Sequence, residues 1–554
     1  MLFSLPGIRA RCAIFVFLLA GFFPLASAQQ DERFDIVRYQ VEGNTLLPQP
    51  EIDAMLAPMT GTGRVYGDIQ RSLEALEAAY RARGYSTVQV YVPEQELGAG
   101  IVRIRVTEAA LDRITVLDNF HFDNDNVLAG LPSLRTGQIP NLSQLSQNIQ
   151  LSNENPAKQV EVLLGAGQQE GKVDAKVTVT EANPQRIFLT ADNTGTAASG
   201  KWRTGVAWQH ANLFNRDHVM TMAYTTSPDS PAGVDVNLFS VGYRLPLYSI
   251  GDSVDFIFGK SSVNSPGTTP TLGGALAIVG KGNVYGVRWN HYFPRRGQQT
   301  DKLVIGVDHK YSDARCAFNG VPFSIAPPTP PVASCVPYTT NPVSATWLAQ
   351  HVSPGQVLDL NLGLAWNIAS GTRYTNANGK VDRYSYLNPG SRNTRDDFRI
   401  LRGGINWLKA LPADWQLKAS GTFQYSSLPL VAAEQIGLAG AATVRGFAER
   451  AFAADSGYVV NLEWVAPEMA SRASLPGTLR LLAFQDLATG FNSNTVGTVV
   501  PRSGTVASVG AGLRYASGRD VAIRADFARV MATGPLTAER TGHWRGHVAV
   551  MIGF

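Results

Sequence analysis

An arginine in a glycine-rich loop is the residue of this chain best suited to a specific polar interaction. Arg445 lies within Thr443–Glu449, which reads Thr-Val-Arg-Gly-Phe-Ala-Glu, and the preceding run 437–442 is rich in glycine and alanine. A guanidinium presents its N–H donors in a planar fork that matches a carboxylate. The expected chemistry is therefore recognition of a carboxylate and not bond making. The alternative is an arginine that faces water on a loop surface.

No set of residues in the sequence indicates an enzyme. The pairs Gly273-Gly274 and Gly403-Gly404 lack the lysine and the following helix of a phosphate-binding loop. The 8 histidines show neither metal-ligand spacing nor pairing with a nucleophile. We therefore expect no catalytic residues, no metal site and no cofactor.

Two cysteines are predicted to form a disulfide. Cys12 would leave with an amino-terminal leader, whereas Cys316 and Cys335 stand in one proline-rich loop. An even pair in an exported chain favours a disulfide, which would stabilise this loop by about 3 kcal/mol. Metal binding needs more ligands than the loop offers, since its nearest histidine is His309.

Residues 1–28 have the pattern of a cleavable secretory signal. Basic residues precede the apolar segment Ala13–Phe23, and Ala26-Ser27-Ala28 stands before Gln29. We expect cleavage between Ala28 and Gln29, followed by a short tail at 29–33. A short membrane anchor is the alternative, but 11 apolar residues are too few to span a bilayer of about 30 Å as a helix.

Composition favours a membrane barrel over a soluble enzyme. No run of 18 apolar residues occurs, which excludes spanning helices. Charged residues make up 17%, below the roughly 25% of soluble domains, and 53 glycines with many aromatic residues suggest strands, turns and aromatic girdles. The net charge of +4 gives no reason to expect a nucleic-acid partner.

Two small α+β modules are expected at 34–109 and 110–183. In the first, a strand ends at Gly43-Asn44, a short helix opens at Pro50, and a second helix begins near Asp68 with apolar residues on one face. Strands near 86–93 and 100–107 follow. The second module repeats this order more weakly, with helices near 124–131 and 142–149 and a closing hairpin at 159–164 and 173–180.

Residues 184–554 read as alternating strands of about ten residues. Val357–Asn367, for example, places leucines and Trp366 on one face and small or polar residues on the other. Backbone groups cannot stay unpaired in hydrocarbon, so such strands must close into a barrel. A soluble sandwich is the alternative. The expected strands number sixteen: 186–193, 202–212, 217–225, 234–243, 253–263, 283–293, 302–312, 343–352, 357–367, 398–408, 415–425, 457–465, 478–487, 506–515, 520–530 and 544–554.

The chain resembles the two-partner secretion transporter family, also called haemolysin secretion/activation proteins. The resemblance rests on Val444-Arg445-Gly446-Phe447, which is similar to the signature loop of barrels that fold or export proteins, and on features of the first module similar to a POTRA domain. These features are Gly43-Asn44, Tyr80, Gly84-Tyr85 and Pro93-Glu94-Gln95. The implied fold is a transmembrane β-barrel of sixteen antiparallel strands preceded by two POTRA domains, in the outer membrane with the POTRA domains in the periplasm.

The resemblance also implies that the loop 426–456 folds into the lumen. Phe484-Gln485-Asp486 is similar to the segment that partners the loop arginine in this family, which makes Asp486 the expected partner of Arg445. The chain departs from the commoner Phe-x-Asp-x-Gly because its glycine is Gly490, four residues after Asp486. We expect no amino-terminal helix to plug the pore, so that closure falls to this loop or to an inward fold of 368–397.

The implied function is export of a partner protein without nucleotide hydrolysis. The POTRA pair would capture a large passenger that carries an amino-terminal secretion domain, resembling an adhesin, haemolysin or contact-inhibition toxin. The expected binding groove lies around the helix 68–83, and its candidate contact residues are Tyr80, Tyr85, Val88 and Val90. The modules are alternatively spacers. The alternatives to protein export are a barrel-assembly insertase and a diffusion porin. The barrel is expected to be a monomer in outer-membrane lipid.

Overall fold

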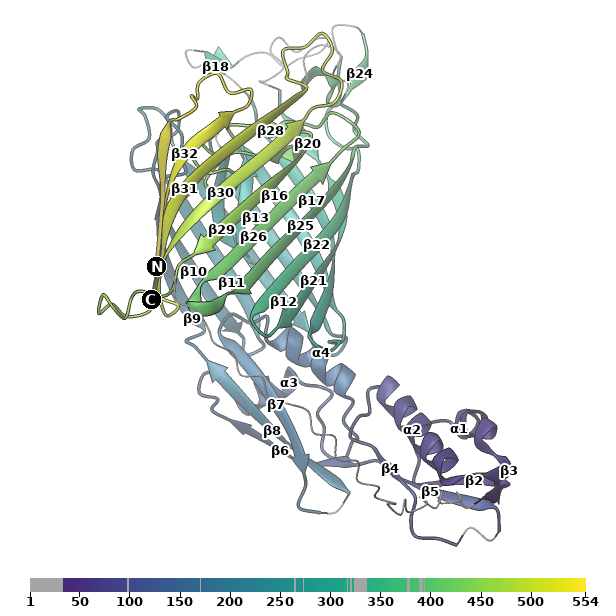
Figure 1. Ribbon diagram of the computed structural model, residues 1–554. Helices are drawn as coiled ribbons and strands as arrows, with labels where there is room; N and C mark the ends of the chain where they lie inside the picture. The colour runs from purple at the N-terminus through teal and green to yellow at the C-terminus, as the bar shows by residue number, and fades with distance from the viewer. Residues whose placement is uncertain are drawn as a thin grey trace, which may run out of the picture. The chain divides into compact units, whose positions relative to one another are not determined.

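The computed structural model describes residues 33–554 apart from 97–98, 170, 264–265, 273, 316, 319–320, 323–335, 376–378, 388–391 and 393. Over these residues the carboxy-terminal part forms a closed antiparallel barrel of sixteen strands, counting β20 and β21 as one, as expected. Its strands run obliquely around the barrel (Figure 1). They are β9 Gln185–Asp192, β10 Arg203–Leu213, β11 His218–Thr226, β12 Asn237–Leu247, β13 Asp252–Ser261, β16 Gly282–Tyr292, β17 Gln299–Ser312, β20 Tyr338–Thr340 with β21 Pro342–Ser353, β22 Gln356–Asn367, β25 Arg399–Ala410, β26 Gln416–Tyr425, β29 Ser456–Val465, β30 Thr478–Phe491, β31 Ser503–Ser517, β32 Val521–Thr533 and β33 Trp544–Gly553.

The barrel closes where the last strand pairs with the first. β33 and β9 run antiparallel with Ala549 opposite Asp192 and Gly553 opposite Phe188. Apolar side chains of these strands, such as Leu189 and Ile552, are exposed on the outer face, where a bilayer would cover them. Among the described residues, no helix has both the length and the apolar character needed to cross a membrane.

In the barrel, the strand predicted at 234–243 is shifted, and the hairpin of β14 and β15 was not predicted. β12 begins at Asn237, and the alternating segment 234–236 before it lies in a connection. Val234 and Val236 pack there with Leu238 and Val263 in a small apolar cluster, which produces the alternation that suggested a strand. The hairpin of β14 (Pro266–Thr271) and β15 (Gly274–Val279) lies between β13 and β16.

The other short elements belong to the connections between barrel strands. β18 and β24 lie at the end of the barrel opposite to helix α4 (Figure 1), so the long connections gather at one end. These elements are β18 Ala317–Phe318, β19 Val321–Pro322, β23 Tyr374–Thr375, β24 Val381–Asp382, η3 Ser385–Leu387, η4 Pro412–Asp414, η5 Ala432–Glu434, β27 Ile436–Gly437 and β28 Ala453–Ala454.

Most of the first module, up to Tyr80 and again over Val88–Thr107, is a compact unit with its own core. Its main sheet has the order β2-β5-β4, and Ile52, Ile69, Leu76 and Tyr80 pack as buried residues of its two helices. The strand expected at 86–93 is shorter, and the second helix begins two residues before Asp68, whose carboxylate accepts a hydrogen bond from the Val65 amide. The elements are β1 Phe34–Ile36, β2 Arg38–Glu42, α1 Gln49–Leu56, η1 Ala57–Met59, β3 Gly61–Arg64, α2 Tyr66–Ala82, β4 Gln89–Tyr91 and β5 Ile101–Thr107.

The second module has the same layout and belongs to one unit with the barrel. Its sheet has the order β6-β8-β7. Both of its helices begin at side-chain caps, because Asp123 accepts from the Asn126 amide and Asn141 accepts from the amides of Ser143 and Gln144. The elements are β6 Ala110–Leu117, α3 Asn124–Ala129, α4 Leu142–Ser152, β7 Lys158–Ala166 and β8 Lys172–Glu181.

A buried lysine joins the second module to a barrel turn. The side chain of Lys158 is 0% exposed and forms an ion pair with Asp217, which is 1% exposed. Its Nζ also donates to Asn126 Oδ1 at 3.0 Å and lies 5.0 Å from the centre of the Phe122 ring. The hydroxyl of Tyr248 donates to Asp217 at 2.6 Å. Burial lowers the pKa of Lys158, and Asp217 opposes that shift.

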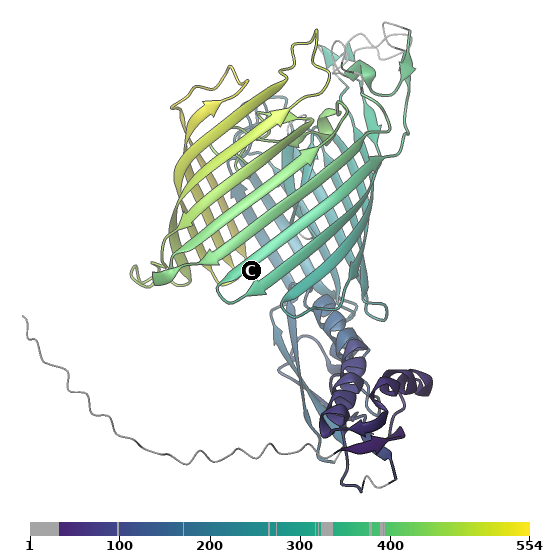
Figure 2. The same ribbon diagram turned by 45° about the vertical axis from the view of Figure 1, so that its right-hand side comes forward.

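The helix α4 and the turn that follows it make further contacts with the barrel at the same end (Figure 2). Glu154 pairs with Arg244 at 3.1 Å and with Lys302 at 3.3 Å. Asn148 Nδ2 donates to the backbone oxygen of Tyr248 at 3.2 Å. These bonds fix the second module to strands β12 and β17 and to the turn after β12.

Replacing Lys158 by Ala should loosen this junction. Asp217 would remain buried without its cation, which typically costs about 3 to 5 kcal/mol. We expect the second module to become sensitive to protease while the barrel stays folded and heat-modifiable. The double variant Lys158→Met/Asp217→Leu should be far less sensitive, because it removes both charges. Equal protease sensitivity of the single and double variants would contradict this account of the junction.

Candidate functional site

The connection 426–456 packs inside the barrel. Its residues Leu438, Val444 and Phe447 form a buried apolar cluster with residues of the wall strands, including Val459 and Val530. The neighbours of such wall residues along the strands point outward: Val460 is 45% exposed, whereas Val459 is 2% exposed. Since side chains of a strand alternate between its two faces, the loop lies on the lumenal face.

A tight turn presents Arg445 to the wall. Gly440 N donates to the Val444 oxygen at 3.1 Å, and Thr443 N donates to the Gly440 oxygen at 3.1 Å. Gly446 follows with φ of +95°, a conformation that favours glycine, and its amide donates to His547 Nε2 at 3.0 Å. A β-carbon at Gly446 would also lie 3.3 Å from the Ala528 β-carbon. The turn therefore requires glycine directly after the arginine.

Arg445 binds three carboxylates. It is 1% exposed, and its Nε and Nη2 donate to the two oxygens of Asp486, each at 2.7 Å. Its Nη1 donates to Glu463 at 2.7 Å and to Asp526 at 3.4 Å. The guanidinium carbon lies 3.5 Å from the centre of the Phe484 ring. We call Arg445, Glu463, Phe484, Asp486 and Asp526 the inner cluster.

The register of the wall strands brings the inner cluster together. Asn461 and Asp486 are opposite each other on β29 and β30, and Glu463 is opposite Phe484. Two-residue spacing puts Glu463 on the same face as Asn461, and Phe484 on the same face as Asp486. Asn461 Nδ2 donates both to Asp486 at 2.8 Å and to the Thr443 oxygen at 2.7 Å, which ties the wall to the loop.

Small residues on β31 make room for the inner cluster. A β-carbon at Gly510 would lie 2.4 Å from the Phe484 ring, and one at Gly512 would lie 2.3 Å from an oxygen of Asp526. Larger residues at either position would therefore displace a wall group that contacts Arg445.

The charges around the inner cluster balance. Asp526 also pairs with Arg514 at 2.8 Å and with Arg524 at 2.7 Å, so three arginines meet the three carboxylates. Arg524 Nη2 donates to the backbone oxygen of Ala441 at 2.7 Å, which adds a second bond from the wall to the loop. This arrangement can hold the loop in one position in the lumen, and Nε, Nη1 and Nη2 of Arg445 each donate to a carboxylate.

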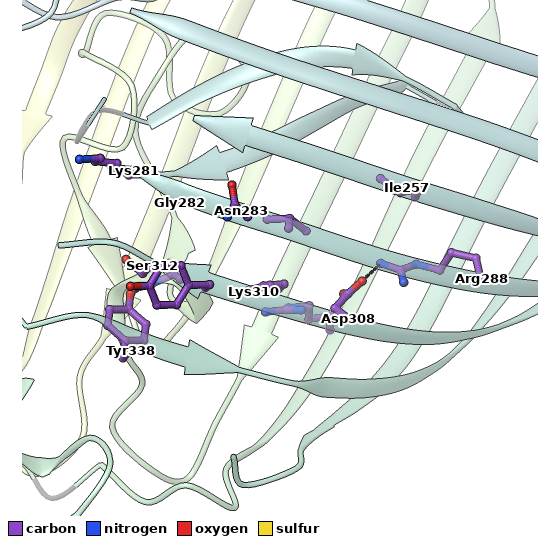
Figure 3. Close-up of a pocket in the computed structure, with 14 residues that line it drawn as sticks. Ile257, Lys281, Gly282, Asn283, Arg288, Asp308, Lys310, Ser312 and Tyr338 are labelled. Carbon is purple, nitrogen blue, oxygen red and sulfur yellow. Dashed lines mark hydrogen bonds and ion pairs between the residues drawn. The ribbon is translucent and has the colours of Figure 1, made fainter. Parts of the chain in front are cut away.

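The base of the loop has a separate set of contacts. The carboxylate of Glu434 is buried, and it binds Lys310 at 2.9 Å, Thr340 at 3.1 Å and Arg402 at 3.2 Å. A lumenal cavity of about 280 Å³ lies beside these residues, and Figure 3 shows Lys310 and Tyr338 on its wall. The wall strands thus hold the loop at its base as well as at Arg445.

The loop residues and the carboxylate that the sequence predicted around Arg445 lie together in the structure. Val444, Gly446 and Phe447 surround Arg445 in the turn, and Asp486 contacts it directly. Glu463 and Asp526 were not expected as further ligands. The alternation of β29 could have identified Glu463 as a lumenal carboxylate, but its distance from Arg445 depends on strand register.

The displaced glycine of the sequence pattern has a packing role. A β-carbon at Gly490 would lie 2.4 Å from the Leu438 side chain and 2.8 Å from the Ala454 β-carbon. Both of these residues belong to the loop 426–456. Gly490 therefore gives the loop space against β30, four residues along the strand from Asp486.

The candidate contact residues in the first module differ in exposure. Tyr80 is 1% exposed and its hydroxyl donates to Asn44 at 2.8 Å, and Val90 is 8% exposed. These two side chains belong to the core of the module, which corrects their assignment as contact residues. Tyr85 and Val88 are half-buried. Within the described part of the module, β4 pairs only with β5, so its other edge carries unpaired backbone groups.

Four of the expected site residues lie outside the described part of the chain. They are Ala28 and Gln29 at the expected cleavage site and Cys316 and Cys335 of the expected disulfide.

Residues 171–514, more than half of the chain, match the family described as haemolysin secretion/activation protein ShlB/FhaC/HecB. Residues 34–109 match the POTRA domain, ShlB-type. Both matches agree with the architecture described above.

Two curated relatives are transporters by name. The chain is 23% identical over 278 residues to the outer membrane transporter CdiB of Escherichia coli O6:K15:H31, which covers 50% of this chain and 46% of that protein. It is 24% identical over 434 residues to the hemolysin transporter protein ShlB of Serratia marcescens, and the match covers 78% of this chain and 72% of that protein. The chain thus spans about half the length of the first of these relatives.

Solved structures share the fold. CdiB from Escherichia coli superposes with a TM-score of 0.72 at 21% identity, covering 96% of this chain and 92% of that one. CdiB from Acinetobacter baumannii superposes with a TM-score of 0.68 at 14% identity, covering 95% and 91%. At these identities the likeness concerns the fold.

Proposed function

Because this chain belongs to the haemolysin secretion/activation protein family ShlB/FhaC/HecB, we propose that it is an outer-membrane transporter that secretes a partner protein through its barrel. The POTRA domains stand in the periplasm and receive the exported passenger. The barrel works as a monomer in outer-membrane lipid. It is a transporter that catalyses no chemical reaction.

The observation that carries this proposal is the loop fixed inside a closed barrel by the inner cluster. A diffusion pore needs no loop whose arginine is matched to three wall carboxylates. A transporter for an unfolded chain needs a lumen that is obstructed at rest and cleared during passage. The inner cluster meets this need, because its bonds are polar and can exchange with water when the loop moves.

The route of the passenger begins at the first module. The free edge of β4 offers backbone donors and acceptors to which an extended segment can add as a strand. Tyr85 and Val88, which are half-buried, remain our candidates for side-chain contacts. Main-chain pairing would suit a passenger that arrives unfolded, because it does not depend on a folded surface.

The route continues along the barrel wall beside the Arg445 turn. A space of about 370 Å³ separates the turn from strands β22, β25 and β26, with Asp359, Asn406 and Ser420 on its wall. These side chains are polar and suit a hydrated path. Folding of the passenger outside the cell supplies the driving force, and no nucleotide takes part.

Co-expression with a candidate passenger tests this function. The passenger is a large exported protein encoded next to this chain, and the readout is its amount in the medium relative to a periplasmic marker. We expect release only from cells that make both proteins. Equal release without this chain, together with a steadily open channel in planar bilayers, would instead assign a diffusion porin.

A further inference from the structure

A second ion pair, on the extracellular side, joins the loop 426–456 to a different connection. The side chains of Arg392 and Asp455 are 1% and 0% exposed. Arg392 Nη2 donates to both oxygens of Asp455, at 2.9 Å and 3.0 Å. We call Arg392 and Asp455 the outer pair. It shares no residue with the inner cluster.

Three connections meet at Asp455. Its carboxylate accepts from the amide of Leu430 at 2.9 Å, which belongs to the same loop, and from the amide of Ser493 at 3.0 Å, which follows β30. Arg392 adds the connection between β22 and β25, and its Nη1 donates to the Ser493 oxygen at 3.0 Å. A single buried carboxylate thus ties the loop to two neighbouring connections.

Apolar packing supports the same contact. Tyr384 and Phe398, which flank Arg392 in the chain, are buried against Leu430 and Val431 at the base of the loop. Tyr384 and Phe398 therefore pack on the base of the loop, which Lys310 and Arg402 of the barrel wall also hold through Glu434.

We propose that the outer pair is a positioning pair that holds the extracellular mouth closed over the base of the loop, and that it must open during export. The proposal rests on the proposed function for the role of opening. Buried charge-assisted hydrogen bonds are strong only while water is excluded. A chain that enters the mouth would hydrate both groups and so weaken the bond that keeps the mouth closed.

Single-channel recording of the full-length protein in planar bilayers tests the outer pair. Arg392→Ala should raise the fraction of time spent in conducting states by about tenfold, because the closed arrangement loses its charged contact. Arg395→Ala is the matched control. Arg395 lies in the same connection and pairs with Asp397 at 2.5 Å, but the two side chains are 58% and 46% exposed. This control should gate like the unchanged protein.

Equal gating by Arg392→Ala and the control, in barrels that remain heat-modifiable, would overturn the proposal. If Arg392→Ala fails to assemble, Arg392→Lys carries the test, since it keeps the charge and loses the separate Nη1 bond to the Ser493 oxygen. The fraction of time that Arg392→Lys spends in conducting states should lie between that of the unchanged protein and that expected for Arg392→Ala. A fraction equal to that of the unchanged protein would refute the role proposed for the outer pair. Asp455→Asn combined with Arg392→Ala should add little to either change alone, whereas additive effects would show that the two residues act separately.

The recording separates this proposal from the proposed function because it needs no passenger. A protein that gates as expected but exports nothing would contradict the proposed function and leave the outer pair in place. A protein that exports normally while Arg392→Ala gates like the control would do the reverse.

Discussion

Arg445→Ala is expected to reduce export by at least about tenfold while the barrel still assembles. The substitution leaves the buried Asp486 without the cation that pairs with it, whereas Asp526 keeps its ion pairs with Arg514 and Arg524. For a group as buried as Asp486, an uncompensated charge costs about 3 kcal/mol or more, so the loop should leave its position on the wall. Passenger in the medium and heat-modifiability of the barrel are the two measurements.

Arg445→Lys should also fail substantially. A single ammonium group cannot make the two parallel bonds to Asp486 and reach Glu463 at the same time. Arg480→Ala provides a control, because Arg480 also stands on β30 but pairs with Asp414, whose side chain is 52% exposed. Export at the normal rate by Arg445→Ala would show that the inner cluster has no part in transport.

Asp486→Asn should have a smaller effect than Arg445→Ala, because Glu463 and Asp526 still contact the guanidinium. The double variant should add little to the loss in Arg445→Ala, since residues in direct contact show coupling of about 0.5 to 3 kcal/mol.

Deletion of residues 34–108 should abolish export and leave the barrel in the membrane. The deletion removes residues 34–80 and 88–107, which form a compact unit, together with the segment 81–87, and it keeps the second module and the barrel, which belong to one unit. Without the free edge of β4 the passenger has no site for strand addition. The measurements are passenger in the medium and the heat-modifiable barrel in membranes. Normal release by the deletion variant would remove the first module from the mechanism.

The alternation of the strands was enough to predict the barrel, because each strand has one lipid-facing side and one lumenal side. Val357–Asn367, for example, is β22 almost residue for residue. Alternation failed at 234–236, where a small apolar cluster in a connection has the same period as a strand. Such clusters depend on contacts with distant residues such as Val263, which local sequence does not reveal.

The inner cluster could be predicted only in part. The pattern Phe484-Gln485-Asp486 pointed to Asp486, but Glu463 and Asp526 reach Arg445 through the register of β29 and β32. A register shift of two residues would keep those carboxylates on the lumenal face but move them away from Arg445, and alternation alone does not decide between such registers. Tyr80 and Val90 were chosen near the groove, although their periodic apolar spacing is equally that of core residues.

The central claim is that the passenger crosses the lumen beside the Arg445 turn, and site-specific photo-crosslinking during export tests it most directly. A photoreactive residue at Ser420 faces the space beside the turn, whereas one at Phe423, on the same strand β26, stands on the outer face, where Phe423 is 39% exposed. The account predicts crosslinks to the passenger from position 420 and none from position 423. Export that proceeds without any crosslink from position 420, or with equal crosslinks from both positions, would contradict passage through the lumen at this point.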